Sequence, residues 1–211
     1  MNRRRFLSLA AVPLLAPRQV LATTTCAPTP YGLGCRSEVP FGSFSQQAYQ
    51  SQAMPQWCWA ACISMVFSYY RHPVNQARIV SEVYGGPVNM PAGTGIVIAR
   101  QLNRAWTDDQ GRPFRSRVTA AYDFDAGVFN VDNGGLINEL DRNRPVVVGT
   151  FTHAVVMTAM DYVRTPLGPN LTGVGVFDPW PGRGARSLSP AEMVPMHLNG
   201  GLRFAATISV Q

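Results

Sequence analysis

The stretch QAMPQWCWAACISMVFSYY, residues 52–70, decides the fold of this chain. Residues 57–70 are almost entirely apolar and rich in alanine, which predicts a largely buried helix that ends before His72 and Pro73. Cys58 stands between two tryptophans, within about the first turn of this helix. An unpaired cysteine there is either a small apolar side chain in the core or a nucleophile. The rest of the sequence decides between these two interpretations.

The first 22 residues, MNRRRFLSLAAVPLLAPRQVLA, combine an arginine cluster, an apolar run and a small-residue end. This pattern is typical of a secretory signal, and the apolar run is too short to be a permanent membrane anchor. Residues 3–7, RRRFL, also fit the twin-arginine export pattern, although three arginines fit an ordinary basic start as well. We therefore expect residues 1–22 to be an export signal and the mature protein, from Thr23, to be periplasmic or secreted.

The charge of the mature chain is small. The sequence has 18 basic and 12 acidic residues and a formal net charge of +6, but four arginines lie in the expected signal, which leaves +2. We therefore predict no binding to nucleic acid or to anionic surfaces. No long apolar run follows Ala22, so we expect no membrane association after the signal is removed. About 190 residues can bury the core of a single domain, which we expect to be monomeric.

Four cysteines remain in the mature chain, in a compartment that favours disulfides. Cys26 and Cys35 flank the turn-rich segment APTPYGLG and could close it with a disulfide. Cys58 and Cys62 are four residues apart on the predicted helix, where Cβ atoms are roughly 5–6 Å apart. A disulfide needs about 3.5–4.5 Å. At least one of these two thiols is therefore expected to stay reduced, which favours a chemical role.

The order of the predicted elements indicates an α+β protein. Residues 23–46 are rich in Thr, Pro, Gly and Ser and are interpreted as a loop-like leader before a domain at 47–211. Helices are expected first and strands of apolar and β-branched residues afterwards, which predicts a helical half and a sheet half. Besides the helix at 57–70, helices are expected at 75–84, 94–105 and 134–143, and strands at 115–122, 145–151, 154–160, 173–177 and 204–210.

A cysteine nucleophile needs a general base, and the chain has three histidines. His72 follows the first helix, where it is better explained as a partner of the helix dipole. His197 lies in the loop PMHLNG with no other reactive group nearby in sequence. His153 stands between two buried strand segments, where a polar ring needs partners to offset its desolvation. Paired with Cys58, His153 is the best candidate base.

A base of this kind also needs a group that orients it. Asp178 ends the strand segment GVGVF, where a carboxylate could hold an imidazole in one tautomer, although Asp before Pro also simply begins turns. Asp161 is the rival, in a context that indicates the end of a hairpin. An amide donor for the oxyanion could come from the glutamines before Cys58, and spacing alone does not choose among them. These glutamines are Gln46, Gln47, Gln50, Gln52 and Gln56.

In this order the residues resemble the papain-like cysteine peptidases. A glutamine six positions before a cysteine that opens a buried helix, followed by a strand-borne histidine and an aspartate, matches that family's set. The segments WCWAAC and DPWPG are most similar to compact bacterial secreted and effector-type peptidases, and similar also to bacteriocin-leader peptidases. The resemblance covers about residues 47–210. The matching residues are Gln52, Cys58, His153 and Asp178.

The resemblance implies a papain-like α+β fold, in which a helical half that carries the cysteine helix packs on an antiparallel sheet or barrel half. It implies that Cys58 is the nucleophile, His153 the base, Asp178 its orienting group and Gln52 an oxyanion donor, with a protein or peptide substrate and no cofactor or metal. Two departures stand out: papain has Asn where this chain has Asp178, and the Cys-Gly-Ser-Cys-Trp pattern of plant papains is absent. The segment before the cysteine is also too short for their usual inhibitory propeptide.

Three other functions use the same residues. A transglutaminase-like acyltransferase or a peptidoglycan amidase could employ the same Cys-His-Asp triad, and the residues do not reveal the acceptor. A catalytically inert binding protein could share the scaffold, since fold does not fix function. A metal site at Cys58 and Cys62 is weaker, because CxxxC supplies only two ligands. The sequence favours an exported cysteine peptidase.

Overall fold

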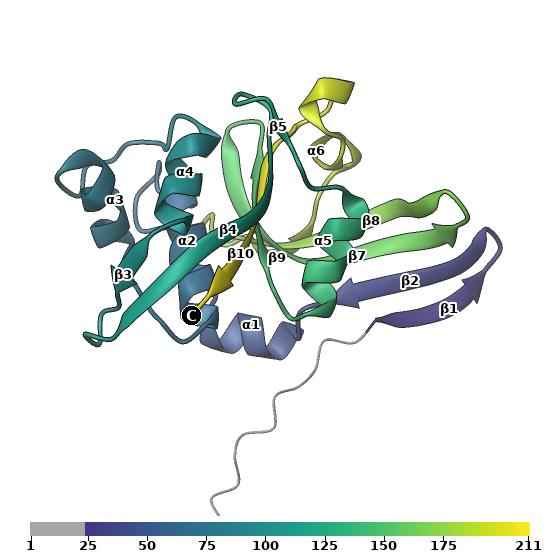
Figure 1. Ribbon diagram of the computed structural model, residues 1–211, viewed down its shortest axis with the longest axis horizontal. Helices are drawn as coiled ribbons and strands as arrows, with labels where there is room; N and C mark the ends of the chain where they lie inside the picture. Colours follow the sequence, from purple (N-terminus) through teal and green to yellow (C-terminus); the bar gives the residue numbers. More distant parts are fainter. Residues whose placement is uncertain (1–23) are drawn as a thin grey trace, which may run out of the picture.

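The computed structural model describes residues 24–211, so the expected signal at 1–22 lies outside the described residues. Strands dominate the molecule, helices α2 to α4 gather toward one end of it, and α1 lies at the bottom of the view near the middle (Figure 1). The helices are α1 (Phe41–Gln47), α2 (Cys58–Tyr69), α3 (Gln76–Tyr84), α4 (Gly95–Leu102), α5 (Asn133–Asp141), α6 (Pro190–Met193) and the 3-10 helix η1 (Met196–Leu198). Within residues 24–211, none of these helices is long and apolar enough to cross a bilayer.

Ten strands form one antiparallel sheet along the path β1-β2-β7-β6-β10-β4-β3, with β5 beside β4 and with β8 between β7 and β9. They are β1 (Thr25–Thr29), β2 (Gly32–Glu38), β3 (Ala105–Thr107), β4 (Pro113–Asp123), β5 (Val128–Phe129), β6 (Val146–Thr150), β7 (His153–Thr165), β8 (Gly168–Asp178), β9 (Gly184–Ser187) and β10 (Leu202–Val210). The prediction of a mixed α+β fold, with a cysteine helix packed on an antiparallel sheet, is confirmed.

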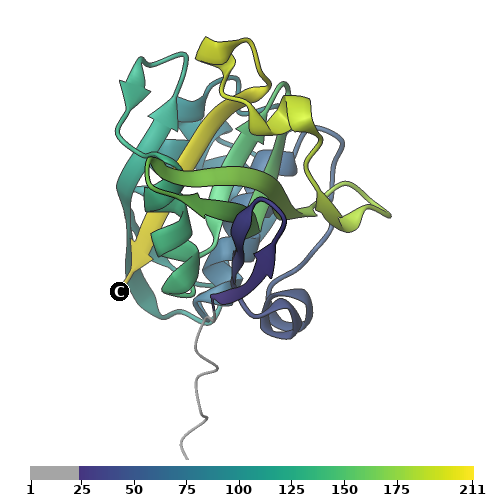
Figure 2. The same cartoon turned by 90° about the vertical axis from the view of Figure 1, so that its right-hand side faces the viewer.

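Strand β7 organises the sheet. Its first part pairs with β6, its second part pairs with β2, and β8 runs along its other edge. The long hairpin β7–β8 therefore projects beside the hairpin β1–β2, away from helices α2 to α4 (Figures 1 and 2). Successive residues from Ala154 to Met160 are buried, so both faces of β7 are covered. Helices α2 and α5 both pack against β6 and β7 and supply this cover.

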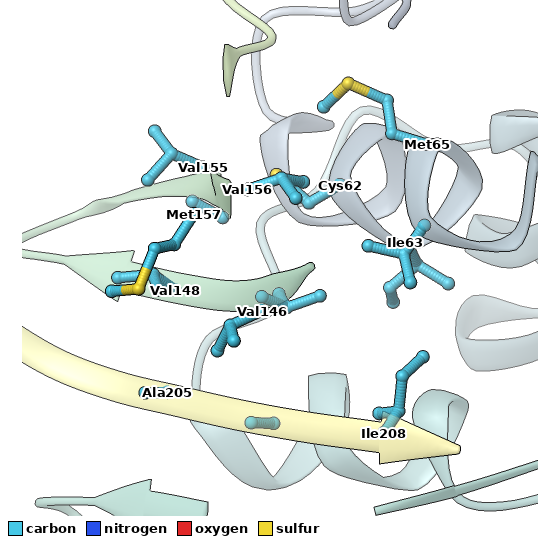
Figure 3. Close-up of a cluster of buried hydrophobic side chains, with 14 of the residues drawn as sticks. Cys62, Ile63, Met65, Val146, Val148, Val155, Val156, Met157, Ala205 and Ile208 are labelled. Carbon is cyan, nitrogen blue, oxygen red and sulfur yellow. The ribbon is translucent and has the colours of Figure 1, made fainter. Parts of the chain in front are cut away.

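Helix α2 lies in the core because its side chains are apolar on every side. Nine consecutive residues, from Trp59 to Phe67, are buried. Figure 3 shows Cys62 and Ile63 of this helix facing Val156 of β7 and Ile208 of β10. A helix that is apolar all round is stable only inside a protein. The burial fixes α2 against the sheet, and with it the position of Cys58 at the first turn.

The expectation of a loop-like leader at 23–46 is wrong. Two of its segments are the strands of the hairpin β1–β2, and a third is helix α1. Cys26 and Cys35 pair directly across the hairpin and form a disulfide, while β2 extends the sheet along β7. The pairing of β2 with β7 joins residues that are distant in the sequence, so local composition did not reveal it.

The other expected elements are present with different ends. The helix expected to reach residue 105 ends at Leu102, since Ala105 already belongs to β3. Strands β7 and β8 are longer than the segments 154–160 and 173–177, because each also pairs through its polar, half-exposed part. The short strand β9 and the helices α6 and η1 were not expected.

Candidate active site

Cys58 is the first residue of α2, with a free and partly exposed thiol. The preceding residue, Trp57, is the helix N-cap and makes no side-chain hydrogen bond to the first turn. The first N–H groups of a helix have no acceptor within the helix, and the helix dipole is positive there. The thiol therefore lies beside uncapped backbone donors, in a setting that favours negative charge.

The two tryptophans around Cys58 make equivalent hydrogen bonds. Trp57 donates its indole N–H to the carbonyl of Val88 at 2.9 Å, and Trp59 donates to the carbonyl of Met90 at 3.2 Å. Both side chains are buried. They therefore hold the segment after α3 against the start of α2, on both sides of the thiol. Trp59 is both a core residue and part of the cleft wall.

His153 and Asp178 meet at the sheet edge above this helix end. His153 is the first residue of β7 and Asp178 the last residue of β8, and the paired strands bring them together. His153 Nε2 lies 2.7 Å from Asp178 Oδ1. The Asp178 side chain is completely buried, whereas the imidazole is 22% exposed. With Nε2 bonded to the carboxylate, the other ring nitrogen is left for the Cys58 thiol, which contributes to the raised pKa of His153.

The electrostatics favour a charged imidazole. Burial by itself lowers the pKa of His153, but hydrogen bonds to Asp178 and Cys58, and the charges of both groups, raise it from 6.5 to about 9. Burial by itself raises the pKa of Asp178, but hydrogen bonds from His153, from the Trp180 backbone N–H and from Arg186 hold it well below its usual value. At neutral pH the pair is thus an imidazolium and a carboxylate. The Trp180 ring, 45% exposed, stands edge-on to His153 with ring centroids 6.3 Å apart.

A cleft of about 370 Å³ opens beside Cys58 and His153. One wall is the segment 91–95 that the tryptophans hold, and the opposite wall comes from the β6–β7 turn and β10. The only charged side chains lining it in the described chain, apart from His153, are Asp125 and Arg203, which neutralise each other through two hydrogen bonds of 2.6 and 2.7 Å. The cleft is otherwise mostly apolar, and it suits an uncharged stretch of chain.

Phe151 in the β6–β7 turn has an unusual backbone conformation. The turn has two residues, since Thr150 pairs with His153, and Phe151 adopts a φ of 46°. This left-handed region is costly for a bulky side chain. The ring is 51% exposed, lines the cleft and lies against Gly201, where a Cβ would approach it to 2.5 Å. The strained turn places the aromatic ring of Phe151 in the same cleft as the candidate base His153.

Gln52 is buried, and its side-chain amide already makes two hydrogen bonds within the protein. Its Nε2 donates to the carbonyls of Met54 and Pro55 at 3.0 and 2.8 Å, and its Oε1 has no hydrogen-bond partner. Its backbone N–H bonds to the carbonyl of Pro179, beside Asp178. The structure thus ties Gln52 to the loop after Asp178, but the oxyanion role stays a prediction.

The rival residues lie elsewhere and have their own partners. His72 is bonded to Asp108 at 3.0 Å, and His197 to the Tyr122 hydroxyl at 3.1 Å. Asp161 lies inside β7, not at a hairpin end as its context indicated, and pairs with Arg36 at 2.8 Å. His72 is thus also bonded to a buried carboxylate, and what distinguishes His153 among the three histidines is that it lines the same cleft as Cys58.

Two residues around Asp178 were missed by sequence reasoning. Arg186 Nε donates to Asp178 Oδ2 at 2.8 Å, and Arg186 is itself held by Glu192 at 2.9 Å. Arg186 lies eight residues after Asp178 on a short strand with no apolar alternation, so no sequence signal marked it. Within residues 24–211, no group of three or more His, Cys, Asp or Glu side chains is placed to hold a metal ion.

Comparison with known proteins identifies the family of this chain. The model of the Peptidase_C39 like family matches residues 44–193, which include the whole set of candidate residues. Among curated proteins, no sequence matches the chain at a significant level. A solved double glycine motif protease from an AMS/PCAT transporter, in complex with its leader peptide, aligns at 13% identity and a TM-score of 0.41, over 78% of this chain and 91% of that one. The chain belongs to the Peptidase_C39 like family and is a papain-like cysteine peptidase.

Proposed function

We propose that the chain hydrolyses peptide bonds through a triad of Cys58, His153 and Asp178. The observation that carries the proposal is that His153, hydrogen-bonded to the buried Asp178, lines the same cleft as the thiol at the start of α2. A thiolate, not a thiol, attacks a carbonyl, and an adjacent imidazolium and a helix N-terminus both favour the thiolate. The raised pKa of His153 keeps that imidazolium in place at neutral pH.

The chemistry proceeds in two steps. The Cys58 sulfur attacks the peptide carbonyl carbon, and the C–N bond breaks as His153 gives its proton to the leaving amine. Water then gives a proton to His153 and attacks the thioester, which releases the acid and restores the thiolate and the imidazolium. Asp178 stays ionised throughout and holds the imidazole in one tautomer.

For the oxyanion, the proposal uses the uncapped Cys58 backbone N–H and the Gln52 side-chain amide. Gln52 Nε2 is bonded to two backbone carbonyls, so it donates to the oxyanion by exchanging one of them. Losing one such donor costs about 10²–10³-fold in kcat. We therefore expect Gln52→Ala to lower kcat by that factor with little change in KM.

The substrate is proposed to be a peptide or an unfolded protein segment. A cleft that opens beside the thiol, with its one pair of opposite charges already neutralised, supports an extended, uncharged stretch of chain. The double glycine motif protease named above was solved with a leader peptide, which agrees with a peptide ligand but adds no weight at that similarity.

The site of action is proposed to be the periplasm or the exterior. The sequence pattern of residues 1–22 supports export, and the Cys26–Cys35 disulfide supports an oxidising compartment. Fractionation of bacteria that express the full chain, with N-terminal sequencing of the product, should find the protein outside the cytoplasm and beginning at Thr23. A cytoplasmic product that retains Met1 would contradict this part of the proposal.

The experiment that tests the triad is intact-mass labelling with a peptidyl-epoxide thiol inhibitor. Wild-type protein should gain one adduct, Cys58→Ala should gain none, and His153→Ala should react much more slowly. Cys62→Ala is the matched control, since it also removes a free cysteine from α2 but should label like wild type. Absence of an adduct on folded, reduced wild-type protein would overturn the proposal.

A further inference from the structure

The carboxylate of Asp178 has more partners than an orienting residue needs. Its Oδ1 accepts from His153 and from the Trp180 backbone N–H at 2.9 Å. Its Oδ2 accepts from Arg186 at 2.8 Å and, more distantly, from Arg183 at 3.5 Å. A guanidinium next to the carboxylate competes with the imidazolium for the same negative charge. An arginine in this place would weaken the effect of Asp178 on His153 unless something balanced it.

Glu192 supplies that balance. Two nitrogens of Arg186 donate to its carboxylate, at 2.9 Å to Oε1 and 3.1 Å to Oε2. Burial by itself raises the pKa of Glu192, but hydrogen bonds from Arg186 and Ser189 lower it to about 2, so the pair is ionised. Both side chains are mostly buried, at 21% and 16% exposed, where charge pairs are screened less than at the surface.

Glu192 is in turn fixed by the fold. Ser189 and Glu192 form a capping box at the start of α6, in which Ser189 N–H donates to Oε2 at 2.8 Å. Thr150 Oγ1 also donates to Glu192, at 3.4 Å, and Thr150 is the residue that pairs with His153 across the β6–β7 hairpin. The contacts therefore make a closed circuit from His153 through Asp178, Arg186, Glu192 and Thr150 back to the hairpin that carries His153.

We propose that Arg186 and Glu192 are a positioning pair for the active site: Arg186 fixes the orientation of the Asp178 carboxylate, and Glu192 offsets the charge of Arg186 so that Asp178 still acts on His153. The proposal rests on the triad described under Proposed function. Neither residue faces the cleft or the thiol, so both act through Asp178. With this pair in place, the Asp178 carboxylate interacts with both the His153 imidazole and the Arg186 guanidinium.

Removing the charge of Arg186 and removing the charge of Glu192 should shift the pKa of His153 in opposite directions. Without the positive charge of Arg186, the carboxylate acts more strongly on the imidazolium; without the negative charge of Glu192, Arg186 draws more on the carboxylate. The other titratable or charged groups that face His153 and Asp178 stay the same in both variants. They are Cys58 on α2, Arg183 in the turn after β8, and the Asp125–Arg203 pair in the cleft.

The experiment follows the His153 imidazole by NMR across pH 5–10 in the full mature protein, without substrate. The signal is assigned by its absence in His153→Ala. Compared with wild type, we expect Arg186→Gln to titrate about half a pH unit or more higher, and Glu192→Gln about half a unit or more lower. Arg186→Lys keeps the charge and should stay near wild type. Arg142→Gln, which removes an exposed arginine paired with Glu139, is the matched control and should also titrate like wild type.

Activity gives the second readout. On a peptide substrate, kcat should fall about tenfold in Arg186→Gln while KM changes little, with partial recovery in Arg186→Lys. The proposal would be overturned if the His153 pKa shifted in the same direction in both Gln variants, or stayed unchanged in the folded variants. Arg186 and Glu192 would then only stabilise the fold. Because the NMR titration needs no turnover, failure of the positioning pair is distinguished from failure of the triad, which the thiol labelling reports separately.

Discussion

The indole N–H of Trp57 bonds to the carbonyl of Val88 at 2.9 Å, and this contact joins the residue before the nucleophile to the segment that leads into the cleft wall at 91–95. Trp59 makes the equivalent contact with Met90 two residues further along. The Trp-Cys-Trp order therefore serves to position the nucleophile and the segment after α3 relative to each other. It places the thiol at the start of a buried helix and, from both neighbouring positions, holds the segment that shapes the cleft.

We expect Trp57→Phe to raise KM for a peptide substrate several-fold with a smaller change in kcat, because the wall loosens while the thiol stays in place. The lost hydrogen bond should lower the free energy of unfolding by about 0.5–1.5 kcal/mol, since Val88 is exposed and water replaces the lost donor. The measurement is steady-state kinetics together with urea unfolding.

The matched control for this variant is Trp106→Phe. Its buried indole donates to the Gln101 carbonyl at 2.9 Å, in the same kind of contact, but Gln101 does not adjoin the cleft wall at 91–95. It should lose at least as much stability and keep the wild-type KM. Equal KM values for the two variants would contradict the proposed role of Trp57.

The pH dependence should follow the imidazolium of His153, whose pKa is raised to about 9. The active ion pair is lost as that proton leaves, so the alkaline limb of kcat/KM should lie near pH 9. The same shift contributes stability that is full below pH 6.5, the unfolded value, and is lost as pH rises through 9. In Asp178→Asn the carboxylate charge is gone, so the alkaline limb should move to lower pH and kcat/KM at pH 7 should fall about 10²-fold.

Asp161→Asn is the control for the pH profile. It also removes a carboxylate from the β7–β8 hairpin, but one that is bonded to Arg36 and not to His153. Its alkaline limb should match that of wild type. An Asp178→Asn profile that keeps the wild-type limb would show that Asp178 does not act on the base.

The sequence predicted those parts of the site that follow from a local pattern of residues, and it missed those that depend on how strands pair. The Cys58 helix was predictable because a long apolar run can only be buried, and His153 because a polar residue interrupts two buried strand segments. The β1–β2 hairpin was missed because its pairing with β7 joins positions more than 100 residues apart. Arg186 was missed although it lies only eight residues after Asp178, because its contact depends on the pairing of β9 with β8 and not on spacing.

The Gln52 prediction shows a different limit of the sequence. The resemblance to papain-like peptidases implied that Gln52, six residues before the cysteine, is an oxyanion donor, but it carried no information on what the amide would otherwise bond. The structure shows the amide between the Met54 and Pro55 carbonyls, contacts that only the local turn geometry determines. Spacing predicts which residue is near a site better than it predicts the direction of its donors.

The two free thiols should differ sharply in reactivity. Burial, with smaller contributions from Cys58 and Asp178, raises the pKa of the Cys62 thiol well above its usual value, and its side chain is completely buried. A disulfide-exchange reagent at pH 7.5 should therefore count one thiol in the folded protein, two in guanidinium chloride and four after reduction. Cys62→Ala should still count one when folded. Two reactive thiols in the folded wild type would contradict the buried position of Cys62.

Phe151 offers a test that separates strain from function. Its φ of 46° suits glycine, so Phe151→Gly should be about 1 kcal/mol more stable than Phe151→Ala, which keeps the strained backbone and also loses the ring. Both variants should raise KM several-fold, because the half-exposed ring that lines the cleft is gone. Phe151→Leu should recover part of the loss.

Asn199→Gly is the control for Phe151→Gly, since Asn199 also has a positive φ, of 63°, but lies at the end of η1, outside the cleft lining. It should gain or lose little stability and leave KM unchanged. Chemical unfolding and steady-state kinetics on the four variants give both readouts. If Phe151→Gly kept the wild-type KM, the ring would serve only to cover Gly201, and the strained turn would have no part in binding substrate.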